Sequence, residues 1–99
     1  MKGVYEQLSV DFNAWAQKLF IDTFEKFRLS VMKLDRRKDE NVFQLQAHKY
    51  ADDMKVNLEN IANDLLSKNK SLRNSECNKI LKENINFYVS EFIQKTKLL

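Results

Sequence analysis

The chain has 99 residues, 43% of them hydrophobic, and a formal net charge of +3, which together predict one globular domain over residues 1–99. It has no proline and a single glycine, Gly3, so folds that need many tight turns, such as β-sandwiches and barrels, are disfavoured. No apolar run approaches the roughly 20 residues that cross a bilayer, and one cysteine excludes an intramolecular disulfide. We therefore expect a small, soluble, cytoplasmic all-α protein. Its heavy use of lysine and asparagine is typical of AT-rich bacterial or phage genomes.

The first predicted helix spans residues 8–35 and is the most apolar segment of the chain. One stripe at helical spacing consists of Ala16, Phe20, Phe24, Phe27, Val31 and Leu34. A second stripe, displaced by about 100°, consists of Leu8, Phe12, Trp15 and Leu19. Two adjacent apolar faces are what a helix needs when it packs against two neighbours.

Two further helices are predicted, over residues 41–66 and 75–97. Their apolar stripes are Phe43, Ala47, Tyr50, Met54, Leu58, Ile61 and Leu65, and then Cys77, Leu81, Ile85, Tyr88, Phe92 and Thr96. The breaks between the helices are short and polar, which favours antiparallel neighbours. The sequence thus predicts an antiparallel, up-down-up three-helix bundle. The residues expected in its core include Phe24, Phe27, Met54, Leu58, Ile61, Ile85 and Phe92.

His48 and Cys77 are each the only residue of their type, so they are the first candidates for catalysis. On antiparallel helices we expect them to lie roughly 25 Å apart, at 1.5 Å per residue. Asp52 and Asp53 are adjacent, so their side chains diverge by about 100° and form no carboxylate dyad. The chain also lacks a glycine-rich loop for phosphates and the usual ligands of a zinc site. We therefore expect no catalytic residues, no cofactor and no metal, and a protein that is not an enzyme.

Apolar residues outside the predicted core stripes are the candidates for a partner-binding surface, and we single out Ile21, Met32 and Val56. Apolar anchors that become buried dominate protein interfaces. The leading hypothesis is therefore a non-catalytic protein–protein interaction module, such as a small inhibitor, an immunity protein or an assembly adaptor. Ile21 and Met32 could also seal against a second copy, which would make the chain a homodimer.

The rival hypothesis is a nucleic-acid-binding bundle that uses its basic ends. The candidate anion-binding residues are Arg36, Arg37, Lys38, Lys95 and Lys97, which an up-down-up bundle gathers at one end. Acidic residues flank the first three and partly cancel their charge, so a solvated turn is the favoured interpretation of this segment. A third hypothesis is that the chain forms a structural part of a larger assembly.

Overall fold

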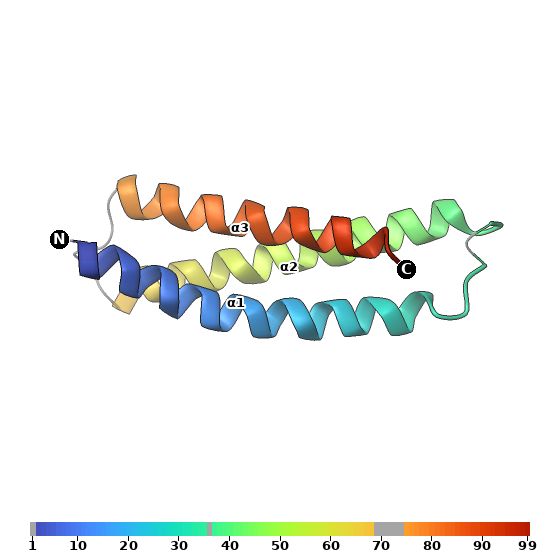
Figure 1. The fold of residues 1–99 in the computed structure, drawn as a ribbon, viewed down its shortest axis with the longest axis horizontal. Helices are drawn as coiled ribbons and strands as arrows, with labels where there is room; N and C mark the ends of the chain where they lie inside the picture. Colours follow the sequence, from blue (N-terminus) through green and yellow to red (C-terminus); the bar gives the residue numbers. More distant parts are fainter. Residues whose placement is uncertain (1, 36, 69–74) are drawn as a thin grey trace.

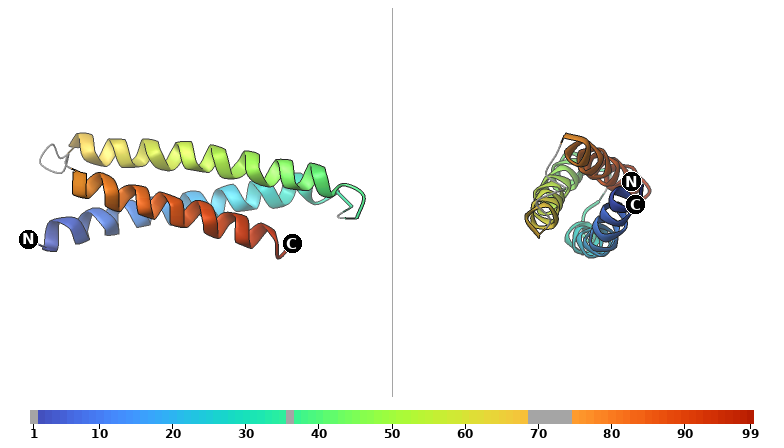
Figure 2. Two further views of the ribbon diagram at one scale, coloured as in Figure 1. Left: turned by 90° about the horizontal axis from the view of Figure 1, so that it is seen from above. Right: turned by 90° about the vertical axis from the view of Figure 1, so that its left-hand side faces the viewer.

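The computed structural model of the protein describes residues 2–35, 37–68 and 75–99, with side chains from Glu6 onward. Three helices, α1 (Lys2–Val31), α2 (Glu40–Lys68) and α3 (Ser75–Thr96), run up, down and up along a rod of 53 × 19 × 19 Å (Figure 1). The end-on view in Figure 2 shows the three helices grouped around one long axis. The predicted all-α three-helix bundle is confirmed. Among the described residues, no helix is both long and apolar enough to cross a membrane.

The predicted helix boundaries agree with the structure to within a few residues, except at the start of the first helix. α1 begins at Lys2, six residues before the predicted start at residue 8. The apolar periodicity shows where the buried face of a helix begins. The helix itself can extend beyond that face until a helix-terminating residue or turn. α1 ends at Val31, before the predicted residue 35, because the chain there enters a hydrogen-bonded turn.

Two aspartates hold the turn between α1 and α2. The backbone carbonyl of Asp35 accepts hydrogen bonds from the amides of Lys38, at 3.0 Å, and Asp39, at 2.6 Å. The side-chain carboxylate of Asp35 accepts from the amide of Arg37 at 2.9 Å, and that of Asp39 accepts from the amide of Asp35 at 3.1 Å. Asp39 then starts α2, since its carbonyl accepts the amide of Phe43 at 2.8 Å. The acidic residues of this segment are thus used to build the turn.

α2 buries small side chains as well as large ones in the core. The small residues that α2 buries are Ala47, Ala51 and Ala62. Phe27 of α1 is fully buried, and its ring centroid lies 5.3 Å from that of Phe43 in α2 and 5.9 Å from that of Phe92 in α3. Phe27 therefore joins all three helices at one point.

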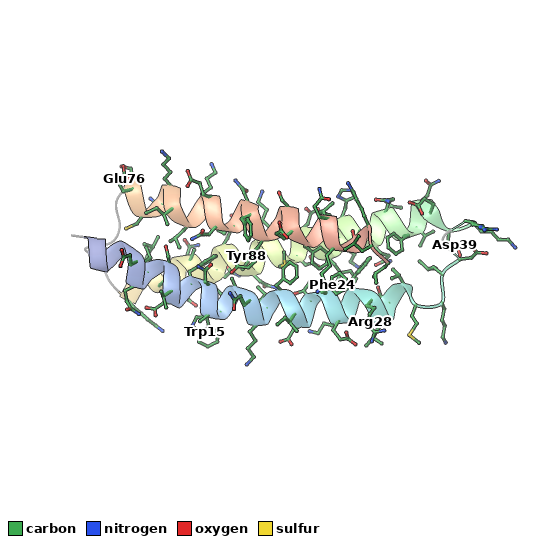
Figure 3. The ribbon with its side chains drawn as sticks, viewed as in Figure 1. Trp15, Phe24, Arg28, Asp39, Glu76 and Tyr88 are labelled. Carbon is green, nitrogen blue, oxygen red and sulfur yellow. The ribbon has the colours of Figure 1, made fainter. Side chains whose placement is uncertain are left out.

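Most of the predicted core is confirmed. The residues that the structure buries as predicted are Phe24, Phe27, Met54, Leu58, Ile85 and Phe92. Ile61 is only half-buried, at the edge of the core. The assignment of Trp15 to an apolar stripe that packs against a neighbouring helix was wrong. Its side chain is 59% exposed and points away from α3 (Figure 3). Trp15 sits at the outer edge of the second stripe, so Leu8 and Phe12 take the buried positions instead.

Candidate functional site

The residues with the most reactive side chains lie in unrelated places. His48 is exposed on α2, whereas Cys77 is fully buried in the first turn of α3. Burial raises the pKa of the Cys77 thiol, and the charge of Glu76 raises it further, so the unreactive protonated form is favoured at neutral pH. In the part of the chain that the structure describes, no three histidine, cysteine, aspartate or glutamate side chains come together as a metal site.

The predicted anion-binding residues that the structure describes belong to two segments, the α1–α2 turn and the C-terminal end of the chain. Arg37 and Lys38 are exposed in the α1–α2 turn, and Arg36 lies outside the described residues. α3 has 22 residues against 30 in α1, and its C-terminal end stops short of that turn (Figure 1). The end of α3, which carries Lys95, is therefore set back from the turn that carries Arg37 and Lys38.

The ammonium group of Lys95 lies over two aromatic rings of α1. Its ammonium nitrogen lies 4.4 Å from the centroid of the Phe24 ring and 5.6 Å from that of Phe20. A cation over the face of an aromatic ring is attracted by the ring quadrupole. Phe24 stands seven residues before the end of α1 at Val31, which is roughly 10 Å along the helix axis at 1.5 Å per residue. Lys97, near the chain end, is exposed.

The three predicted partner-binding residues are all exposed but do not share a face. Ile21, Met32 and Val56 are 64%, 64% and 57% exposed. Val56 lies two residues from Met54 and two from Leu58, both fully buried, so it is on the solvent side of α2. Met32 follows the last residue of α1. Ile21 alone lies beside a groove between two helices.

This groove, called here the α1–α3 groove, is lined by Gln17, Phe20, Ile21, Phe87, Tyr88 and Glu91 and has a volume of about 290 Å³. Half-buried Phe20 and buried Tyr88 form its floor, and exposed Ile21 and Phe87 form its two rims. α1 and α3 share the least extensive of the three helix–helix interfaces, which leaves the space between them open to solvent. The lining is mainly apolar.

The floor of the groove is fixed by side-chain contacts between α1 and α3. The Tyr88 hydroxyl donates a hydrogen bond to Oδ1 of Asn13 at 3.0 Å. The ring of Tyr88 lies 6.3 Å from that of Phe20 and 5.6 Å, edge-on, from that of Phe87. Burial raises the pKa of Tyr88, and a hydrogen bond with Gln17 partly offsets this rise. Figure 3 shows Tyr88 and Phe24 pointing into the space between α1 and α3.

One acidic residue of α3, Glu91, belongs to the lining of the groove. Phe87 and Glu91 are one helical turn apart and both are exposed. Glu83, one turn before Phe87, is not part of the lining and lies roughly 80° around the helix from Glu91. Within the described ranges, neither glutamate takes part in an ion pair. On α1, the nearby carboxylate of Glu25 is neutralised by Arg28, which forms a bidentate pair with it. That hydrogen-bonded pair lowers the pKa of Glu25.

The other two helix pairs have more polar grooves. The α1–α2 groove is lined by Trp15, Ile61, Asp64, Leu65 and Lys68 and measures about 280 Å³. The α2–α3 groove, of about 290 Å³, has a rim of lysines, asparagines and one glutamate, including Lys55, Glu59 and Lys82. Of these three grooves, the α1–α3 groove has the least polar lining, although the α1–α2 groove also holds the exposed ring of Trp15 beside Ile61 and Leu65.

Sequence reasoning identified Ile21 but missed Phe87 and Glu91, its neighbours across the groove. Phe87 was detectable, because it is a large apolar residue that falls outside the stripe of the third helix. Comparison of the chain with protein-family models, with curated proteins and with solved structures finds no significant match.

Proposed function

We propose that this chain is a non-catalytic helical module that binds another protein through the α1–α3 groove. The observation that carries the proposal is the pairing of Ile21, 64% exposed, with Phe87, 58% exposed, above a floor of Phe20 and Tyr88. Exposed apolar groups that gather on one face mark interaction sites, whereas single exposed apolar residues are ordinary. Large aromatic and aliphatic anchors at the centre of a patch supply most of the affinity of protein interfaces.

The chemistry of the groove favours a protein over the alternatives. Nucleic acid binds through cations that neutralise phosphates, but the charged residue in the groove lining is Glu91. Lys95, the nearest cation of α3, is already engaged with Phe24 and Phe20. A small-molecule site would enclose most of its ligand, whereas this groove is shallow and open along its length.

A catalytic role receives no support from the groove residues. Its titratable side chains are Glu91 and Tyr88. Nucleophilic or acid–base catalysis needs a reactive group hydrogen-bonded to a suitable base. The Tyr88 hydroxyl instead bonds to the amide side chain of Asn13, and burial disfavours its ionisation.

Affinity capture with matched variants tests the proposal. The tagged chain is expressed in the cells that encode it, and bound proteins are identified by mass spectrometry after nuclease treatment. The test variant is Ile21→Ala with Phe87→Ala, and the control is Val56→Ala, an exposed apolar residue on the solvent side of α2. We expect one protein that the wild type and the control retain and that the groove variant loses. Retention by the groove variant, or capture of nucleic acid alone, would contradict the proposal.

A further inference from the structure

We propose that two copies of this chain associate through their α1 helices, which meet antiparallel across Trp15, with Asp11 of each copy beside Lys18 of the other. The inference goes beyond the proposed function, because it uses a different face of the bundle. Trp15 is 59% exposed and points away from α3 (Figure 3), whereas the α1–α3 groove lies between α1 and α3. The groove of each copy therefore stays open to another protein.

Trp15 forms the exposed edge of an apolar patch between α1 and α2. Its ring lines the α1–α2 groove, of about 280 Å³, together with half-buried Ile61 and Leu65. The charged residues of this lining, Asp64 and Lys68, have opposite formal charges. A tryptophan ring beside other apolar groups leaves a large apolar area in water when nothing covers it. Association across Trp15 removes that area from water, which is the main driving force for protein association.

The charges around Trp15 identify a second copy of the chain as the occupant. Asp11 lies four residues before Trp15 and Lys18 three residues after it, so each stands about one helical turn away and at most about 60° around the helix. A twofold axis that crosses α1 at Trp15 reverses the direction of the second helix. Asp11 of one copy then faces Lys18 of the other, and the same pair recurs on the other side of the axis. The face is thus complementary to itself.

Both charged side chains are accessible to a second copy. Asp11 and Lys18 are exposed. Asp11 accepts a hydrogen bond from the neutral side-chain amide of Gln7 at 2.8 Å, which leaves its negative charge in place. Asp22, one turn after Lys18, forms no ion pair with it in the part of the chain that the structure describes. A parallel dimer would instead place Asp11 against Asp11 and Lys18 against Lys18, and such like-charge contacts oppose association. The antiparallel arrangement is therefore favoured.

The dimer is expected to be weak and to carry two binding sites. A contact made mainly by one helix of each copy is small, and exposed ion pairs add little affinity, so we expect a dissociation constant on the order of 10–100 μM. Because the contact uses a face of α1 that lies away from α3, the dimer presents two α1–α3 grooves. A partner that is itself oligomeric then gains affinity by binding both grooves at once.

Sedimentation of the wild type over a range of concentrations tests the dimer, with the fluorescence of Trp15 recorded on the same samples. Trp15 is the only tryptophan of the chain, so burial of its ring on association should shift the emission to shorter wavelength. We expect both signals to follow the same concentration dependence. Trp15→Ala should leave a monomer, whereas Ile21→Ala with Phe87→Ala, in the α1–α3 groove, should leave the dimer unchanged.

Charge reversal tests the antiparallel register. Asp11→Lys and Lys18→Asp each place like charges across the twofold axis, so each should weaken the dimer by about tenfold or more at low salt. The double variant, Asp11→Lys with Lys18→Asp, restores opposite charges and should recover the wild-type affinity. The control, Asp52→Lys, makes the same charge change at an exposed position on α2 and should leave the dimer nearly as strong as the wild type.

Three results would overturn the inference. The first is a wild type that stays monomeric at the highest concentration, and the second is a dimer in which the emission of Trp15 does not change. The third is a dimer that keeps its affinity in both single charge variants, because Asp11 and Lys18 would then not meet. None of these bears on the proposed function, which the capture experiment tests separately. A dimer that the groove variant abolishes would contradict both, because a second copy would then occupy the α1–α3 groove.

Discussion

The hydroxyl of Tyr88 in α3 donates a 3.0 Å hydrogen bond to Oδ1 of Asn13 in α1, directly beneath the α1–α3 groove. The bond joins two parallel helices whose mutual interface is the least extensive in the bundle. Side-chain hydrogen bonds between buried or half-buried groups fix the register of packed elements as well as adding stability. The floor of the proposed binding site is therefore held in place before any partner arrives.

Removal of this hydrogen bond should cost stability without changing the fold. Tyr88→Phe keeps the ring, so we expect the free energy of unfolding to fall by about 1 kcal/mol, measured by urea denaturation. Tyr50→Phe is the control, because Tyr50 is a half-buried tyrosine whose ring packs against another core ring, that of Phe27. Equal losses in the two variants would show that the bond to Asn13 contributes nothing of its own.

The raised pKa of Tyr88 predicts a loss of stability at alkaline pH. Its pKa in the unfolded chain is about 10, and burial raises it in the folded protein. The stabilisation is fully present below the unfolded pKa and is lost as pH rises through the folded pKa, because the unfolded chain gives up its proton first. We expect the free energy of unfolding to fall above pH 10 more steeply in the wild type than in Tyr88→Phe. Parallel pH profiles would be inconsistent with this assignment.

Truncation of fully buried core side chains should greatly reduce the free energy of unfolding. Leu58 and Phe92 are both fully buried, so Leu58→Ala or Phe92→Ala should each reduce the free energy of unfolding by about 2–5 kcal/mol. Val56→Ala, on the solvent side of the same helix as Leu58, should change it by about 0.5 kcal/mol or less. Losses under about 1 kcal/mol at both core sites would mean that the buried face is assigned wrongly.

Cys77 should resist alkylation in the folded protein. Its thiol is fully buried, and burial raises its pKa, so both access and thiolate content are low. We expect iodoacetamide to modify it at neutral pH only as fast as the chain unfolds, and quickly in denaturant. Leu58→Ala should accelerate the reaction, because it increases the unfolded population. Fast modification of the native wild type would show that the start of α3 is open.

The fold was predictable because the apolar spacing within each helix indicates which of its faces is buried. The spacing of Met54 and Leu58 on α2, or of Ile85 and Phe92 on α3, defines one face without knowledge of the other helices. Trp15 shows the limit of this reasoning. Periodicity gives the direction of a side chain, but only the placement of neighbouring helices decides whether the edge of a stripe is covered.

The site was less predictable because it depends on how far each helix extends along its neighbours. Ile21 could be singled out as apolar and off the stripe, but its pairing with Phe87 follows from the alignment of α1 with α3. The same alignment places Lys95 over Phe24 and leaves the end of α3 short of the α1–α2 turn. Long-range packing, such as Phe92 against Phe24, sets that alignment, and no local pattern encodes it.

The affinity of two variants for the captured partner tests the central claim most directly. One is Ile21→Ala with Phe87→Ala in the α1–α3 groove, and the other is Arg36→Ala with Arg37→Ala at the basic turn. We predict that the groove variant loses at least about 30-fold in affinity and that the turn variant binds nearly as the wild type does. The opposite pattern, together with an affinity that falls steeply with salt, would place the site at the basic end and identify nucleic acid as the partner.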